Sequence, residues 1–270
     1  MKNVKEMTPE ELAKHKRMKR NSWIVFGLLV FIRFFFFEHY MVPSSSMTPT
    51  LLTGDIIFIK KYEFGWSRLS VPYGGYLPFK NRIELGKPKY GDMAVFVLSR
   101  DPSTYYVKRV VALEGDRVQI KNAVLHVNDQ PVKFDYVGKF TFRNDAGKME
   151  TGFEYRITMP FAKNKTYTVY RNAPIGLGHI DNTPEFKVPK GYVWVQGDFH
   201  TGSADSFSPS FFGGPISIDR LVGKPVFVLY GSNARLPQES NLVLWLIQLP
   251  WRVLVSLKDT NFKRICRFVE

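Results

Sequence analysis

Tyr105-Tyr106-Val107-Lys108-Arg109-Val110-Val111-Ala112-Leu113 is a run of aromatic and β-branched residues that only two basic side chains interrupt. Such a composition favours a β-strand. Shorter runs of the same kind lie at 56–59, 93–97, 118–120 and 192–195, and Gly-Asp pairs separate them at 54–55, 91–92, 115–116 and 197–198. The chain shows no regular alternation of strands with helices. It therefore predicts a mainly β fold built of antiparallel sheets.

The N-terminal region has the pattern of a membrane anchor. Residues 1–21 are polar and basic, and an apolar run from Trp23 to Phe37 follows, broken only by Arg33. Because a bilayer core of about 30 Å needs about 20 helical residues, we expect a transmembrane anchor at 22–40. A removable signal peptide is the alternative, which Pro43 beside the most plausible cleavage point disfavours. The basic flank predicts a cytoplasmic N-terminus and places the remainder on the outer side of the membrane.

The net charge of +14, with a pI near 9.7, fits nucleic acid, an anionic membrane surface or an acidic partner. The anchor favours a lipid bilayer as the partner, and the absence of a nucleic-acid motif argues against DNA or RNA. Cys266 is the single cysteine, which excludes an intramolecular disulfide, and the histidines are scattered. We expect neither a metal nor an organic cofactor.

Two apolar segments leave alternatives open. The aromatic stretch 62–79 fits either a core hairpin or a loop that enters the membrane interface. Residues 242–257 are apolar, but Pro250 and Arg252 interrupt them, and basic residues follow. We therefore expect the C-terminal segment 233–270 to be membrane-associated, with an interfacial helix favoured over a second span or a docked core helix.

Candidate chemistry follows the anchor directly, in Pro43-Ser44-Ser45-Ser46-Met47-Thr48-Pro49-Thr50-Leu51. A serine-rich tract is usually a linker, but the apolar Met47 and the rigid Pro-Thr-Leu interrupt this one. A serine hydroxyl needs a base to act as a nucleophile, and no histidine here has a suitable context. Lys108 can serve if burial lowers its pKa. Since successive strand residues alternate, we expect one of Lys108 and Arg109 to face a buried site and the other to face water.

Together these motifs resemble the type I signal peptidases. The motif set of that family is Pro-Ser-x-Ser-Met-x-Pro-Thr-Leu, Gly-Asp, Tyr-x-Lys-Arg with a following Gly-Asp, and Gly-Asp before Ser-x-Asp-Ser. This chain carries them in that order at 43–51, 54–55, 106–109 with 115–116, and 197–198 with 203–206. Several ordered motifs are far more specific than any one of them.

The resemblance implies a role for each matching residue. Ser46 matches the nucleophile and Lys108 the general base. Ser44 matches the side-chain oxyanion donor, which works with the backbone N–H of Ser46, and Ser203 matches the serine that orients the lysine. The positions that match structural support are Arg109, Asp198 and Asp205. Those that match the shallow apolar pockets for small side chains are Val42, Leu51, Tyr106 and Val107.

The resemblance also implies a domain organisation. A catalytic domain in two parts, 41–120 and 188–232, surrounds a smaller β-rich inserted domain at 121–187. The last motif departs from the family, because Phe199, His200 and Phe207 stand where Asn and two Arg are usual. An Asp–Arg ion pair expected there cannot form in the same way. Ser45 replaces a common glycine, and we expect His200 to have a surface role.

The implied function is membrane-bound signal peptidase activity. Such an endopeptidase removes N-terminal signal peptides from exported preproteins after small-x-small sites, through an ester acyl-enzyme, at the bacterial inner membrane. A Ser/Lys peptidase of the same superfamily with a dedicated conjugation or pilus substrate is one alternative. The other is a membrane-tethered β domain that binds without cutting.

Overall fold

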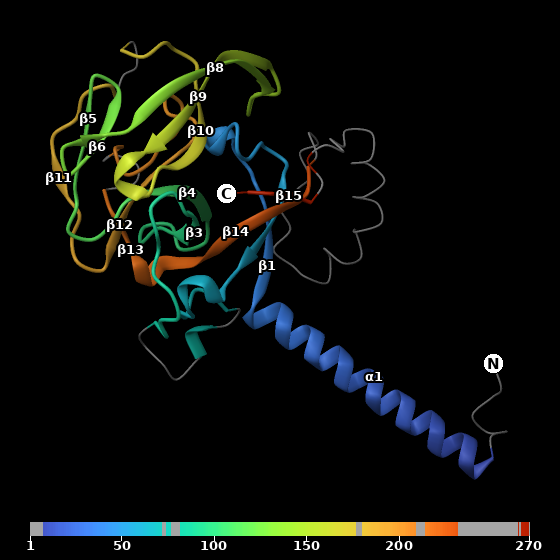
Figure 1. Cartoon of the computed structure of the whole chain (residues 1–270). Coiled ribbons are helices and arrows are strands. Elements are labelled where there is room, and N and C mark those ends of the chain that lie inside the picture. Colours follow the sequence, from blue (N-terminus) through green and yellow to red (C-terminus); the bar gives the residue numbers. More distant parts are fainter. Residues whose placement is uncertain are drawn as a thin grey trace.

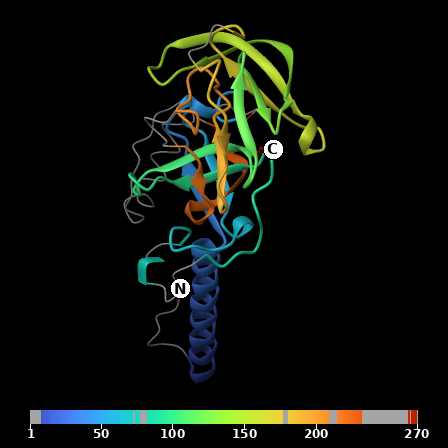
Figure 2. The ribbon, with the colours of Figure 1, turned by 90° about the vertical axis from the view of Figure 1, so that its left-hand side faces the viewer.

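The computed structural model of the chain describes residues 8–71, 74–76, 82–176, 180–208, 214–231, 264 and 266–269. Within them, one α-helix, α1 (Pro9–Phe35), projects from a body of β-sheets (Figures 1 and 2). The mainly β, antiparallel fold expected from the sequence is confirmed. The expected C-terminal membrane segment 233–270, with its apolar part 242–257, lies almost wholly outside the described residues.

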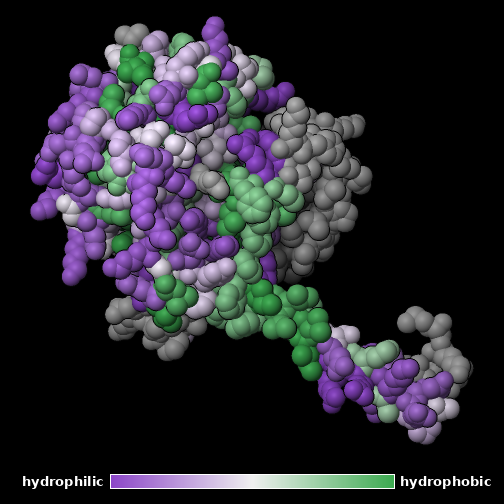
Figure 3. Space-filling view, in the orientation of Figure 1, coloured by the Kyte–Doolittle hydropathy of each residue, from purple (hydrophilic) through white to green (hydrophobic). Residues whose placement is uncertain are grey.

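Helix α1 begins with a complete capping box. The N–H of Glu11 donates to Thr8 Oγ1 at 3.3 Å, and the N–H of Thr8 donates to Glu11 Oε2 at 2.8 Å. Pro9 then occupies the first turn, where its missing N–H removes no hydrogen bond. The second half of the helix exposes large apolar side chains, and Trp23 is 70% exposed. Figure 3 shows this apolar half next to the β body, with the polar half beyond it.

The helix that covers most of the expected anchor at 22–40 ends before that range does. The helix ends at Phe35, and β1 (Phe37–Met41) follows at once, pairing antiparallel with β2 (Ile56–Lys60). Within β1, the Glu38 carboxylate lies 3.0 Å from Lys61 Nζ, and Arg33 also contacts it, so both basic groups balance its charge. No helix in the described part of the chain is both long and apolar enough to cross a membrane.

The largest sheet of the described residues combines two distant parts of the chain. Its strand order is β1-β2-β14-β3-β4-β12-β13, and β15 pairs with β14. The remaining strands of this sheet are β3 (Met93–Val97), β4 (Tyr105–Ala112), β12 (Tyr192–Gln196), β13 (Ile216–Ser217), β14 (Leu221–Tyr230) and β15 (Arg267–Phe268). All five residues of β3 are buried, as expected for a strand covered on both faces.

Two smaller sheets come from the intervening segment. One has the order β10-β9-β8 and the other β11-β5-β6-β7. Their strands are β5 (Arg117–Lys121), β6 (Val124–Val127), β7 (Gln130–Pro131), β8 (Lys133–Arg143), β9 (Met149–Met159), β10 (Lys165–Arg171) and β11 (Phe186–Lys187). Trp194 of the large sheet shares a buried cluster with Val118 and Val169, so the segment packs directly on that sheet. The domain boundaries themselves stay a prediction.

Three of the four Gly-Asp pairs form the same turn. In each, the aspartate carboxylate accepts the N–H of the residue three positions earlier: Leu52 for Asp55, Lys89 for Asp92 and Leu113 for Asp116. The preceding glycines all have positive φ, between 78° and 91°, which L side chains rarely adopt. The sequence reading of these pairs as turns between strands is thus confirmed, and the fourth pair, Gly197-Asp198, has a different role.

Candidate active site

Ser46 and Lys108 meet, although 62 positions separate them in the sequence. Ser46 lies in the short 3₁₀ turn η2 (Ser45–Met47), and Lys108 lies in the middle of β4. Lys108 Nζ donates a hydrogen bond to Ser46 Oγ. Alternation along β4 turns Lys108 toward this turn, and the lysine side chain is only 3% exposed. The contact is of the kind that links a serine nucleophile to its base.

Burial is the main influence on the charge of Lys108. Desolvation lowers the pKa of its ammonium group to about 8, because a low dielectric disfavours the charged form. The negative charges of Asp205, Asp198 and Asp145 oppose this effect by raising the pKa. The lower pKa leaves far more neutral amine near neutral pH than an ordinary lysine has, and a lysine base requires that neutral form.

Ser44 and Ser203 both lie close to Ser46. Ser44 Oγ donates to Ser46 Oγ at 3.3 Å, which places the expected oxyanion donor beside the expected nucleophile. Ser203 Oγ donates to the Ala204 carbonyl at 3.2 Å. A Cβ added at Gly197 would overlap Ser203 and would lie 2.6 Å from the carbonyl oxygen of Ser46. The fourth Gly-Asp pair therefore brings the Ser203 segment close to the nucleophile turn.

Arg109 is fully buried, which corrects the expectation that one of the two basic residues of β4 faces water. Its guanidinium binds the Asp198 carboxylate through two N–H donors, at 2.8 and 2.7 Å, and lies 4.4 Å from the ring centre of Tyr167. Tyr167 belongs to β10, so a second β layer covers this face of β4. Thr50 Oγ1 also donates to Asp198 at 2.5 Å. This hydrogen bond connects residues 44–53, which we call the nucleophile segment after the expected role of Ser46, to the same ion pair.

Asp205 is held by backbone groups behind the site. Its carboxylate accepts the N–H of Gly197 at 3.1 Å and of Phe207 at 3.0 Å. Burial raises the pKa of Asp205 to about 6, although these hydrogen bonds and Lys108 lower it. Asp205 thus contributes a negative charge near Lys108 that is present above pH 6.

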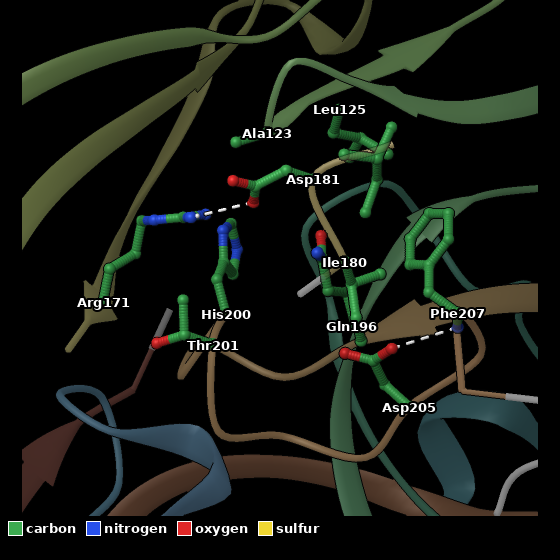
Figure 4. Close-up of a pocket in the computed structure, with 11 residues that line it drawn as sticks. Ala123, Leu125, Arg171, Ile180, Asp181, Gln196, His200, Thr201, Asp205 and Phe207 are labelled. Carbon is green, nitrogen blue, oxygen red and sulfur yellow. Dashed lines mark hydrogen bonds and ion pairs between the residues drawn. The ribbon is translucent and has the colours of Figure 1, made fainter. Parts of the chain in front are cut away.

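His200, for which the sequence suggested a surface role, is partly exposed and partly packed inside the protein. It lines a small cavity beside the buried ion pair of Arg171 with Asp181, whose atoms lie 3.0 Å apart, and Asp205 lies on the opposite side (Figure 4). Desolvation, with the charges of Arg171 and Arg109, lowers the pKa of His200 to about 3. The backbone at this point lies along β10, since Phe199 forms a parallel bridge with Tyr170 and the N–H of His200 donates to the Tyr170 carbonyl at 3.0 Å.

Three of the four expected pocket residues lie together. Val42 and Leu51 are buried in one cluster, and Val107 packs against it. Tyr106 faces the other way, as alternation requires, and packs in a different cluster with its hydroxyl 2.9 Å from Asp101. The structure therefore groups Val42, Leu51 and Val107 with Met47, the residue after Ser46. It places Tyr106 in another cluster, on the face of β4 that alternation assigns to Lys108.

Sequence reasoning missed one residue at the site, Asp145. It lies in the turn between β8 and β9, and its carboxylate binds Ser45, the neighbour of Ser46. The Asn-Asp-Ala-Gly sequence at 144–147 signals a tight hairpin turn. It gives no sign of a contact with a segment 100 positions away.

Comparison with known proteins adds an independent finding. The protein-family model described as "Signal peptidase, peptidase S26" matches residues 16–230. A signal peptidase I of Rickettsia akari (strain Hartford) is 33% identical over 230 residues, covering 81% of this chain and 82% of that protein. A signal peptidase I of Rickettsia rickettsii (strain Sheila Smith) is 35% identical over 226 residues, covering 79% and 80%. A solved signal peptidase I from Enterococcus faecalis V583 superposes with a TM-score of only 0.30 at 19% identity over 52% of this chain and 98% of that one, which supports no argument.

Proposed function

The chain belongs to the S26 family of signal peptidases, and on that premise we propose that it removes signal peptides from exported preproteins with a Ser46–Lys108 dyad. The observation that carries the dyad is the hydrogen bond between Lys108 Nζ and Ser46 Oγ in a buried setting. Membership of a peptidase family argues against the non-enzymatic binding domain that the sequence left open.

The acylation step begins with neutral Lys108. Its Nζ accepts the proton of the Ser46 hydroxyl as Ser46 Oγ attacks the carbonyl carbon of the scissile peptide bond. The tetrahedral intermediate then collapses, the C–N bond breaks, and the proton passes from Nζ to the leaving amine. An ester joins Ser46 to the signal peptide. Lys108 next takes a proton from a water molecule as the water oxygen attacks the ester carbon. The bond from that carbon to Ser46 Oγ then breaks, and the proton passes from Nζ to Oγ, which restores Ser46.

The oxyanion of each tetrahedral intermediate needs hydrogen-bond donors. The Ser44 hydroxyl lies beside Ser46 Oγ, at 3.3 Å, and can turn from that oxygen to the new oxyanion. The backbone N–H of Ser46 is the natural second donor because it belongs to the attacking residue. A single donor of this kind typically contributes about 3–4 kcal/mol to transition-state stabilisation.

The apolar residues next to the dyad fit a substrate with small side chains. Val42, Leu51 and Val107 share one apolar cluster with Met47, the residue after Ser46. Strand β12 pairs with residues 109–112 of β4, which follow Lys108 in the strand. We expect the substrate to lie extended along the preceding part of β4, as an added strand.

The exposed apolar half of α1 supports a bilayer as a further partner. Trp23 is 70% exposed, Ile24 62% and Leu29 59%, and Figure 3 shows that this surface continues onto the adjoining β body. Apolar surface of this extent is typical of a membrane-binding segment. We propose that it holds the chain at the bacterial inner membrane with the N-terminus cytoplasmic and the dyad on the outer side.

Cleavage of a preprotein with a small-x-small site, by the full chain in detergent, tests the proposal. Ser46→Ala and Lys108→Ala should each abolish cleavage and remain folded. Ser103→Ala and Lys190→Ala change an exposed serine and an exposed lysine, so they should cleave like the unmodified chain. Cleavage that survives Ser46→Ala or Lys108→Ala would refute the dyad.

A further inference from the structure

The turn that carries Ser46 is held by a residue from the inserted segment. Asp145 Oδ1 accepts the backbone N–H of Ser45 at 2.9 Å, and Oδ2 accepts the Ser45 hydroxyl at 3.1 Å. Thr53 Oγ1 also donates to Oδ1, at 2.7 Å. One carboxylate thus joins both ends of the nucleophile segment, from a hairpin about 100 positions further along the chain.

The hairpin turn forms without help from the Asp145 side chain. Asn144 Oδ1 accepts the N–H groups of Ala146 and Lys148, each at 3.0 Å, and the N–H of Gly147 donates to the Asn144 carbonyl at 2.8 Å. Gly147 supplies the positive φ of 79° that closes the turn. Asn144 therefore stabilises the turn, and the Asp145 carboxylate remains available for the nucleophile segment.

Asp145 supplies a hydrogen-bond acceptor to the start of the η2 turn, which has no side-chain cap of its own. The first N–H groups of a helical turn have no partner within it, and the side chain before the turn usually accepts one of them. Here that side chain belongs to Ser44, which makes no such hydrogen bond and donates instead to Ser46. Asp145 accepts the N–H of Ser45, the first N–H of the turn, while Ser44 lies beside Ser46.

We propose that Asp145 is a positioning residue for catalysis, which holds the Ser45–Ser46 backbone so that Ser46 Oγ meets Lys108 and Ser44 faces the oxyanion. The inference rests on the proposed dyad. Ser45 is the matching partner: a glycine at that position would keep the N–H contact and lose the hydroxyl contact. The inserted hairpin is thereby a part of the active site.

A second effect of Asp145 is electrostatic. Its charge raises the pKa of Lys108, together with the charges of Asp205 and Asp198, against the lowering by burial. Removing the charge of Asp145 alone leaves the other two carboxylates in place. The pKa of Lys108 should then fall, and the acid limb of the pH–rate profile should move to lower pH.

The experiment compares Asp145→Ala, Asp145→Asn and Asp135→Asn in the full chain, with kcat, KM and the acid limb of kcat/KM as readouts. Asp145→Ala should lower kcat by about tenfold to a hundredfold with little change in KM, because a small displacement of the nucleophile costs this much. Asp145→Asn keeps an acceptor oxygen, so it should retain more activity and still shift the acid limb. Asp135→Asn removes an exposed carboxylate from β8 and should change neither.

Two further variants separate the possible failures. The double variant Ser45→Gly, Asp145→Ala should show a smaller fold-loss of kcat than the product of the two single fold-losses. The reason is that both substitutions remove the same contact, between the Ser45 hydroxyl and the Asp145 carboxylate. Wild-type kcat and an unshifted acid limb in Asp145→Asn and Asp145→Ala would overturn the positioning role, even if Ser46→Ala is inactive. Activity in Ser46→Ala would instead refute the dyad on which the inference rests.

Discussion

The burial of Lys108 predicts a cleavage rate that rises with pH through about 8. Desolvation lowers the pKa of this lysine from 10.5 to about 8, which corresponds to about 3 kcal/mol against the ammonium form. At pH 7 about one-tenth of the lysine is then neutral, about 300-fold more than for a lysine with its ordinary pKa. Because only the neutral amine accepts the Ser46 proton, kcat/KM should fall about tenfold for each pH unit below 8.

The assay is steady-state cleavage of a peptide with a small-x-small site between pH 6 and 10, in detergent. The peptide should carry no group that titrates in this range. An acid limb near 10.5 would refute the buried base, and so would a rate that is flat between pH 6 and 9. The Ser46→Ala chain provides the background rate at each pH.

The same pKa shift makes a prediction about stability. The folded-state pKa lies below the unfolded value, so the unfolded chain binds the proton more readily, and Lys108 destabilises the fold at pH 7. This penalty disappears as the pH rises from 8 to 10.5. Lys108→Met should therefore be inactive and more stable at pH 7 by about 1–3 kcal/mol, because an apolar side chain avoids the desolvation cost. Denaturant unfolding that shows the same stability difference at pH 7 and pH 10.5 would contradict the assignment.

Two other substitutions test the surroundings of the dyad. Ser44→Ala should lower kcat about a hundredfold or more at nearly constant KM, through loss of an oxyanion donor, and steady-state kinetics that show an unchanged kcat would exclude that role. Asp198→Ala should destabilise the fold by about 3–5 kcal/mol, because it leaves the Arg109 guanidinium buried without its counter-ion. A loss below about 1 kcal/mol in a denaturant titration would mean that water reaches Arg109.

Local patterns in the sequence were sufficient to predict much of the protein. Short aromatic and β-branched runs predicted the antiparallel β fold, because side-chain alternation and backbone preference act over a few residues. The Gly-Asp pairs predicted turns, because glycine tolerates a positive φ and the aspartate side chain is short enough to accept an N–H from its own turn. The ordered motifs identified the family and nominated Ser46 and Lys108 before any geometry was known.

Other features required the tertiary structure. Alternation showed that Lys108 and Arg109 face opposite ways, but only the packing of β10 on β4 revealed that both sides are buried. The apolar run did not show that α1 ends at Phe35 and that the next residues pair with β2 as strand β1.

Asp145 shows the limit most clearly. Its own neighbours in sequence specify a hairpin turn, and they carry no information about Ser45, which the fold brings to within hydrogen-bond distance of it. The sequence alone determined the elements, the turns and the chemical candidates, because these depend on interactions between near neighbours in the chain. The tertiary structure decided which candidates meet, which charges are buried and what holds the nucleophile, because those depend on contacts between strands far apart in sequence.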